Sequence, residues 1–143
     1  MQCSTAPIQP LKVCRMNTVK TLPTLALTPE DRADLTRAAT LIETLRAVSP
    51  SLTLAQAATL ISAALNQGSS ITEIARASGL NLTAVSVNVG ILGGGVRQNA
   101  KRIEGLELLQ ADYAPDSNRT KVVTLTPRGA STIRALLGAI RRT

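Results

Sequence analysis

The stretch that decides the fold is Ser70–Leu92, which reads SITEIARASGLNLTAVSVNVGIL. Ser70 and Glu73 form a capping-box pattern, which predicts a short helix directly after Ser70. Gly79 suits a tight turn with a positive φ. Asn81 can cap a second helix, because its side chain accepts a hydrogen bond from a free backbone amide of the first turn. The stretch therefore predicts two short helices joined by a tight turn.

The two predicted helices also carry suitable residues for close packing. Ala75 is small enough for the point where the helices cross, and Val85 and Val89 would fill the angle between them. Two short helices related in this way are typical of a helix-turn-helix motif.

A β-strand is the competing interpretation of Ala84–Leu92. The apolar residues of this segment fit a period of two as well as a helical period, so periodicity alone does not choose between them. The capping residue Asn81, the capped helix before it and the hairpin signal that follows all favour the helix.

The three glycines at Gly93–Gly95 raise the question of a phosphate-binding loop. A Walker loop needs a lysine directly after its last glycine and then a serine or threonine, so that amides, ammonium and hydroxyl converge on phosphate and magnesium. Here no lysine adjoins the glycines and no hydroxyl follows Lys101. We therefore interpret the glycines as a helix terminator and flexible hinge, and we expect no nucleotide site.

Beyond the glycines, apolar residues recur at helical spacing from Val96 to Ile103, which predicts a short helix that ends at Gly105. This helix would carry three basic residues, namely Arg97, Lys101 and Arg102. Such residues either neutralise phosphates or form the solvated face of a helix, and the residue types leave both interpretations open.

The pattern changes again over residues 106–127. Two β-prone runs flank the turn-forming segment APDSN at 114–118, which predicts a β-hairpin over about 107–126. Thr126 can then cap a last helix in which Pro127 takes the first position.

Three longer helices are predicted besides the short pair, and each has one apolar stripe. The stripes are Leu35, Ala38, Ile42 and Leu45 in the helix over 28–49; Leu54, Ala58, Ile61 and Leu65 in the next helix; and Ile133, Leu137 and Ile140 in the last helix, over 127–142. The first stripe requires a partner helix, either within the chain or on a second subunit.

The composition favours a polyanionic partner and disfavours catalysis. The 143 residues include 16 basic and 9 acidic ones, which gives a net charge of +7, although a merely soluble basic surface would explain the same charge. Tyr113 is the only aromatic residue, which disfavours stacking on single strands. Because the chain contains no histidine, it has no Ser-His-Asp triad and no imidazole ligand. We expect no enzyme, no metal and no cofactor.

Residues 1–27 read as an irregular, flexible arm that contains three prolines and is not a signal peptide. Met16 is an alternative start. Cys3 and Cys14 are too few for a zinc site and fit a reducing compartment. No apolar run approaches the length of a membrane span. We expect a cytoplasmic protein, in a bacterium or in the host cell if the chain is encoded by a phage.

These elements together resemble the MarR (multiple antibiotic resistance regulator) family over about residues 52–137. The matching segments are LTLAQAATLISAAL (52–65), SSITEIARASGLNLTAVS (69–86) and GLELLQADYAPDSNRTKVVTLTPRG (105–129). The last is the most specific, because Arg119, Leu125, Thr126 and Gly129 stand in the family's register. The chain looks like a divergent, phage- or plasmid-type branch in which a glycine-containing segment lengthens the path between the second short helix and the hairpin.

The resemblance implies a mainly α fold with a small β-hairpin wing, that is, a winged helix-turn-helix. It implies a homodimer in which helices 28–49 and 127–142 form the dimerisation region and 51–126 form the DNA-binding core. The second short helix would enter the major groove of double-stranded DNA, and the wing would reach the adjacent minor groove. The expected DNA-binding residues are Asn81, Thr83, Ala84, Ser86, Val87, Asn88, Arg97, Lys101, Arg102, Asn118, Arg119 and Lys121.

The sequence departs from the family at the positions that matter most for DNA. Val87 and Ile91 stand where the family carries basic residues, and Ser117 stands where the acid of an Asp-x-Arg wing motif belongs. We predict a transcriptional regulator, a repressor that binds a pseudo-palindromic operator. The alternative is a winged-helix adaptor that binds a host protein, because Val87 and Ile91 exposed together would form an apolar patch.

Overall fold

The computed structural model describes residues 25–141. The chain divides into two units, 1–32 and 33–143, and helix α3 (Pro29–Val48) begins at the end of the first. The Asp31 amide donates to the Thr28 hydroxyl at 3.1 Å, and the Thr28 amide donates to the Asp31 carboxylate at 2.9 Å. Thr28 therefore caps the N-terminus of α3. Hydrogen bonds from the Thr28 backbone and side chain lower the pKa of Asp31 because they favour its ionised form.

The predictions for Cys3, Cys14, Met16 and most of the 1–27 arm lie outside the described residues. The second unit holds the rest of α3 and all later elements. In chain order these are α4 (Leu54–Leu65), β1 (Ser69–Ser70), α5 (Ile71–Ser78), α6 (Leu82–Leu92), β2 (Gly95–Gln98), β3 (Lys101–Glu104), β4 (Leu109–Ala114), β5 (Ser117–Leu125) and α7 (Pro127–Arg141).

Helices α5 and α6 form the predicted helix-turn-helix. Each residue that predicted it forms the expected hydrogen bond or adopts the expected backbone conformation. The Ser70 amide donates to the Glu73 carboxylate at 2.8 Å, and the Glu73 amide donates to the Ser70 hydroxyl at 3.2 Å. Gly79 has a φ of 72°, in the left-handed region. The Asn81 side chain accepts a hydrogen bond from the Ala84 amide at 2.7 Å. The helical interpretation of Ala84–Leu92 is therefore confirmed.

The main hydrophobic core lies among α4, α5, α6 and the wing. Ala75, Val85 and Val89 are buried there, as the packing argument predicted. The residues that form this core are Leu60, Ala63, Ile74, Ala75, Val85, Val89, Leu92, Leu108, Leu109 and Val123.

The predicted core stripe of α4 is wrong. Leu54 and Leu65 are 82% and 78% exposed, and Ile61 also faces solvent. The buried face carries Ala57, Thr59, Leu60, Ser62 and Ala63 instead. Helix α4 is apolar around most of its circumference, so a helical period fits more than one face. The face with small residues is buried because it allows α5 and α6 to approach closely.

Helices α3 and α7 bury only part of their predicted stripes. Leu45 of α3 is buried in a second small cluster with Ala57 and Leu136, and Ile133 of the predicted α7 stripe packs against this cluster. Leu136 itself lies outside the stripe predicted for α7. The large apolar residues that remain 40% or more exposed on these two helices are Leu35, Ile42, Leu137 and Ile140. Within residues 25–141, most of either stripe is therefore left uncovered.

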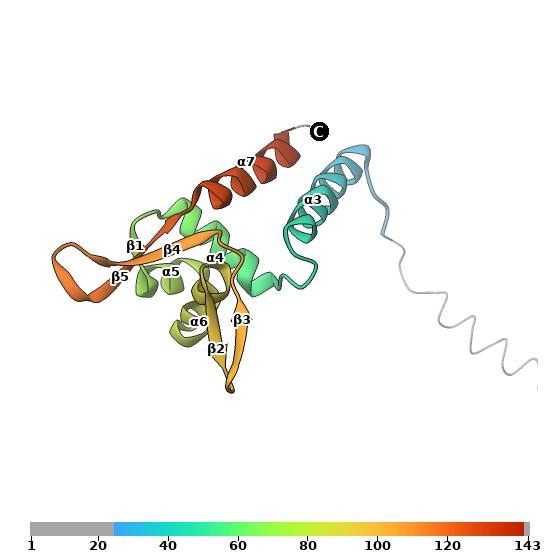
Figure 1. Cartoon of the computed structure of the whole chain (residues 1–143). Helices are drawn as coiled ribbons and strands as arrows, with labels where there is room; N and C mark the ends of the chain where they lie inside the picture. Colours follow the sequence, from blue (N-terminus) through green and yellow to red (C-terminus); the bar gives the residue numbers. More distant parts are fainter. Residues whose placement is uncertain (1–24, 142–143) are drawn as a thin grey trace, which may run out of the picture. The chain divides into compact units, whose positions relative to one another are not determined.

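The predicted wing is present as β4 and β5, which pair antiparallel with β1 in the order β1-β5-β4 (Figure 1). Residues 115 and 116 form the turn at its tip, and the pairing is irregular next to Tyr113 and Ala114. Thr126 joins the wing to α7: its hydroxyl accepts from the Gly129 amide at 3.0 Å and donates to the Glu107 carbonyl at 2.6 Å. The hydrogen bond from the Gly129 amide to the Thr126 hydroxyl explains why this threonine and glycine lie three residues apart.

The helix predicted between Val96 and Ile103 is wrong, because this segment forms a second hairpin of β2 and β3. Val96 lies directly opposite Ile103, so two residues that fit a helical period pair across two strands instead. The turn consists of Asn99 and Ala100, with φ values of 51° and 64°. Positive φ at both central residues matches the two-residue turns that join antiparallel strands.

Candidate nucleic-acid interface

Helix α6 presents small and polar residues to solvent along its first half. Thr83 and Ser86 are exposed, and Ala84 is half-buried. Asn81 precedes them and is also exposed, although its side-chain oxygen is used in capping the helix. Serine and threonine hydroxyls can both donate to and accept from base edges. This part of α6 therefore has the chemistry of a helix that contacts bases.

Asn88 is a correction to the predicted set of DNA contacts. It is only 8% exposed, and its side-chain amide donates to the Thr59 hydroxyl at 3.2 Å. The Thr59 hydroxyl donates in turn to the Ala55 carbonyl at 2.9 Å. A buried amide needs such a partner, because an unpaired one would lose its hydrogen bonds to water. Asn88 therefore joins α6 to α4 and does not face a ligand.

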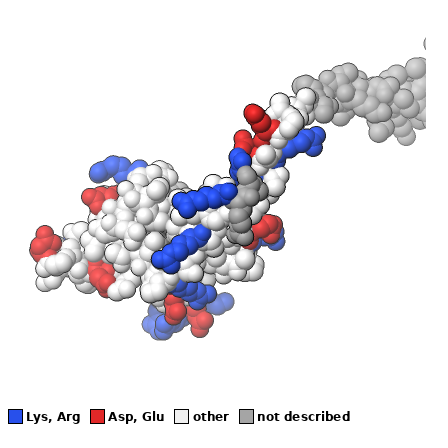
Figure 2. Space-filling model, turned by 90° about the horizontal axis from the view of Figure 1, so that it is seen from above, with Lys and Arg blue, Asp and Glu red and all other residues white. Residues whose placement is uncertain are grey.

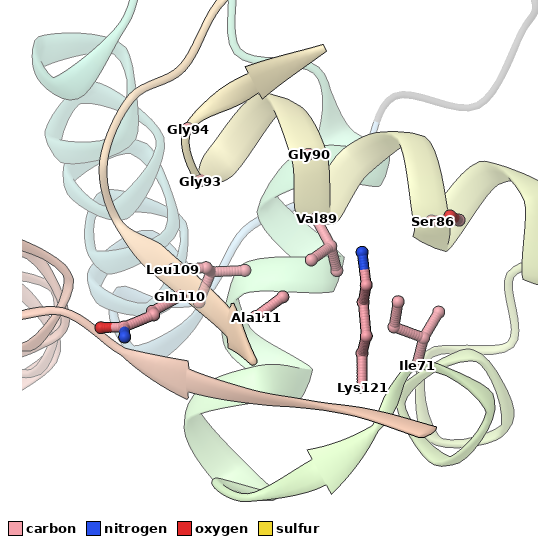
Figure 3. A pocket seen from close by; sticks show the side chains of 10 residues that line it. All are labelled: Ile71, Ser86, Val89, Gly90, Gly93, Gly94, Leu109, Gln110, Ala111 and Lys121. Atoms are coloured by element: carbon pink, nitrogen blue, oxygen red, sulfur yellow. The ribbon is translucent and has the colours of Figure 1, made fainter. Parts of the chain in front are cut away.

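A hollow separates α6 from the wing. Ser86, Val89 and Gly90 line it from α6, and Lys121 lines it from β5. Figure 3 shows the Lys121 side chain extending from β5 toward α6. A second hollow between the same two elements is lined by Ser86, Lys121 and Arg119 among others. The two hollows share Ser86 of α6 and Lys121 of β5, so they adjoin each other between α6 and the wing. We call this region the groove.

The wing tip carries the predicted residues Asn118 and Arg119, and both are exposed. The Arg119 amide donates to the Ser117 hydroxyl at 3.3 Å, so the serine takes a structural position at the tip. Lys121 is also exposed, and its ammonium lies 5.3 Å from the centre of the Tyr113 ring. This contact holds the lysine on the side of the wing that borders the groove.

The remaining predicted basic residues, Arg97, Lys101 and Arg102, lie on the β2–β3 hairpin and not on a helix. All three are exposed, and within residues 25–141 none of them forms an ion pair. Figure 2 shows the basic side chains of one face in separate groups and not as one continuous surface. The structure thus places positive charge on the wing and on a second hairpin that follows the C-terminal end of α6. The signal that would have predicted this hairpin is the placement of two β-branched residues, Val96 and Ile103, on either side of the turn that begins at Asn99.

Val87 and Ile91 test the apolar patch that the adaptor alternative requires. Both residues are half-buried, so neither forms a fully exposed patch on α6. Among the described residues, no group of three His, Cys, Asp or Glu could hold a metal ion. Over the same part of the chain, no helix is long and apolar enough to cross a membrane.

Comparison with known proteins gives matches at the level of structure alone. No family model and no curated protein matches the sequence. RV1404 from Mycobacterium tuberculosis superposes with a TM-score of 0.61 at 21% identity, over 82% of this chain and 77% of that one. The MarR family transcription regulator SP03579 gives 0.52 at 20% identity, over 96% and 74%.

A third similar structure is that of BpsR from Bordetella bronchiseptica, a protein whose DNA binding is regulated by 6-hydroxynicotinic acid. Its TM-score is 0.52 at 16% identity, over 80% of each chain. These likenesses define the class of fold: the chain has a winged helix-turn-helix fold like that of the MarR family transcription regulator SP03579. The resemblance predicted from the sequence is confirmed at that level.

Proposed function

We propose that this protein is a sequence-specific regulator that binds double-stranded DNA as a homodimer and represses transcription in the bacterial cytoplasm. One observation supports the proposal most directly: Ser86 on α6 lines the same hollow as Arg119 and Lys121 on the wing. A polar helix beside a basic hairpin provides both parts of a DNA contact, one for bases and one for the backbone.

The geometry divides the work between the two elements. The major groove is about 12 Å wide and accepts an α-helix, so Thr83, Ala84 and Ser86 would approach base edges there. Arg119 at the wing tip suits the narrow and negative minor groove beside it. Lys121 would neutralise a phosphate, which fixes position and does not read sequence.

The exposed apolar residues of α3 and α7 support the homodimer. Leu35 and Ile42 are 55% and 49% exposed, and Leu137 and Ile140 are 40% and 48% exposed. A second copy would cover these residues by helix pairing. Two copies related by a two-fold axis would place their α6 helices one helical turn of DNA apart, at about 34–36 Å. The proposed operator is therefore an inverted repeat.

Selection of bound fragments from a random pool of duplex DNA tests the proposal. We expect enrichment of an inverted repeat whose half-sites are about 10 base pairs apart. Ser86→Glu should abolish enrichment, because it places a negative charge against the bases. Ser131→Glu is the matched control, since Ser131 is also an exposed helical serine but lies on α7. Failure of the wild-type chain to enrich any sequence would overturn the proposal.

A protein-binding adaptor is the second candidate, and the exposed leucines of α4 favour it. Leu54 and Leu65 together present an apolar surface that has no role in the DNA-binding proposal. The adaptor predicts no enrichment of DNA in the same selection. It also predicts that Leu54→Glu, and not Ser86→Glu, abolishes binding to the partner protein.

A further inference from the structure

The β2–β3 hairpin is fixed to the end of α6. A Cβ atom on Gly105 would collide with the backbone of Gly93 and Gly95, so there is no room for a side chain there. The Leu106 amide also donates to the Ile91 carbonyl at 3.0 Å. These contacts make Gly93, Gly95 and Gly105 a site of close packing, whereas a Cβ on Gly94 would meet nothing within 4 Å.

The charge on this hairpin is arranged unfavourably for an isolated protein. Arg97 lies directly opposite Arg102, and like charges in directly opposed positions destabilise a strand pair. Lys101 adjoins Arg102, and the only acid in these strands, Glu104, lies opposite Gly95. An external anion between or beside the two arginines would remove this repulsion.

The hairpin follows the C-terminal end of α6, and β2 begins three residues after α6 ends. Gly93 and Gly94, which join the two, also line the first hollow together with Leu109 of β4. Figure 1 shows β2 and β3 extending in a different direction from β4 and β5. Four strand residues span about 13 Å at 3.3 Å per residue. This length is close to the width of a major groove, about 12 Å.

We propose that the β2–β3 hairpin is a second DNA-binding arm, in which Arg97 and Arg102 hold backbone phosphates of a duplex beyond the C-terminal end of α6. The inference rests on the proposed DNA-binding function and extends the contact of each subunit beyond it. The partner is double-stranded, because the hairpin contains no aromatic residue on which an unpaired base would stack. Paired arginines separated by strand spacing suit the regular phosphates of a duplex.

The salt dependence of binding tests the arm without knowledge of the operator. The full chain is titrated onto a fluorescein-labelled, 40-base-pair duplex of mixed sequence, with anisotropy measured between 50 and 300 mM KCl. Each neutralised phosphate contributes about 0.9 to the slope of log K against log salt, so Arg97→Gln with Arg102→Gln should lower the slope by about 1.8 per bound subunit. If the two lines meet near 1 M salt, affinity at 0.1 M falls about 60-fold.

Two further variants separate the outcomes. Arg97→Lys with Arg102→Lys keeps the charge and should keep the wild-type slope. Arg128→Gln with Arg134→Gln removes the same charge from exposed positions on α7 and should also leave the slope unchanged. An unchanged slope in the Arg97→Gln, Arg102→Gln protein would overturn the second arm while the proposed function stands. Absence of binding by the wild-type chain would instead overturn the proposed function.

Discussion

The two hairpins of this chain are held in place in different ways. The wing is continuous with the core: Val123 of β5 and Leu109 of β4 are fully or almost fully buried, and β1 adds a third strand. No residue of the β2–β3 hairpin is buried, and its two strands pair only with each other. Because an isolated two-stranded hairpin is at best marginally stable in water, this hairpin depends on its attachment to α6.

The comparison also shows where charge is tolerated. The wing places Lys121 opposite Tyr113, whose ring offers its electron-rich face to the ammonium. The β2–β3 hairpin places arginine opposite arginine, with no such compensation. The wing is therefore stabilised by a contact between its own strands, whereas the β2–β3 hairpin carries opposed like charges that destabilise it.

The largest expected effect comes from filling the glycine at the base of the wing. A Cβ on Gly129 would collide with the backbone of Leu108, a fully buried core residue. Replacing a helical glycine by alanine gains about 0.5–1 kcal/mol, but overpacking against backbone costs about 3 kcal/mol. We expect Gly129→Ala to lower the free energy of unfolding by about 2 kcal/mol, measured by urea denaturation.

The same substitution at Gly105 should act on the other hairpin. Its Cβ would meet the backbone of Gly93, so we expect loss of hydrogen-exchange protection in β2 and β3 before the rest of the domain. Gly94→Ala is the matched control, because nothing lies within 4 Å of its Cβ position. If Gly105→Ala and Gly94→Ala behave alike, the hairpin is not fixed by close packing.

Arg119→Ala is expected to have an intermediate effect, on DNA binding and not on stability. Arg119 is exposed and uses only its backbone amide in a hydrogen bond within the wing, so its side chain can be removed without unfolding the protein. One lost phosphate or minor-groove contact corresponds to a slope change of about 0.9 and to about 8-fold weaker binding at 0.1 M salt. Anisotropy on the same 40-base-pair duplex measures this change.

The loss of DNA affinity in Arg119→Ala should add to the loss caused by substituting Arg97 and Arg102, because in the proposed complex the two hairpins would touch different phosphates. Additivity in the triple variant would show two independent arms. An Arg119→Ala protein that binds as tightly as the wild type would remove the wing from the mechanism and leave the second hairpin as the main basic contact.

The parts of the fold that could be predicted from the sequence are those with local signals. The α5–α6 pair was predictable because Ser70, Gly79 and Asn81 act on backbone groups within three residues of themselves. The buried face of α4 was not, because Leu54 and Leu60 are equally apolar and only the contacts with α5 and α6 distinguish them. Long-range packing decided that face.

The candidate site divides in the same way. Thr83, Ser86 and Arg119 are exposed, as a DNA-binding role requires, because the capped helix and the hairpin turn position them locally. Asn88 could not be assigned from sequence, since its partner Thr59 lies 29 residues away. The β2–β3 hairpin was missed because an Asn-Ala turn lacks the glycine of the usual Asn-Gly signal.

Placing a glycine in this turn should have the smallest of the predicted effects on stability, and it tests the difference between the two hairpins most directly. Ala100 has a φ of 64°, which costs a residue with a Cβ about 1 kcal/mol relative to glycine. We expect Ala100→Gly to increase the protection of the β2 and β3 amides by about 1 kcal/mol, measured by hydrogen exchange. Ala111→Gly in the extended strand β4 is the control, and it should weaken the wing by about 0.5–1 kcal/mol.

The consequence for binding follows from charge. Ala100→Gly removes no basic residue, so the salt dependence of duplex binding should stay the same while the bound hairpin becomes less costly to order. A modest gain in affinity at constant slope would show that the arm is ordered on binding. A loss of affinity would mean that Ala100 itself contacts DNA, because its substitution otherwise relieves strain and changes no charge.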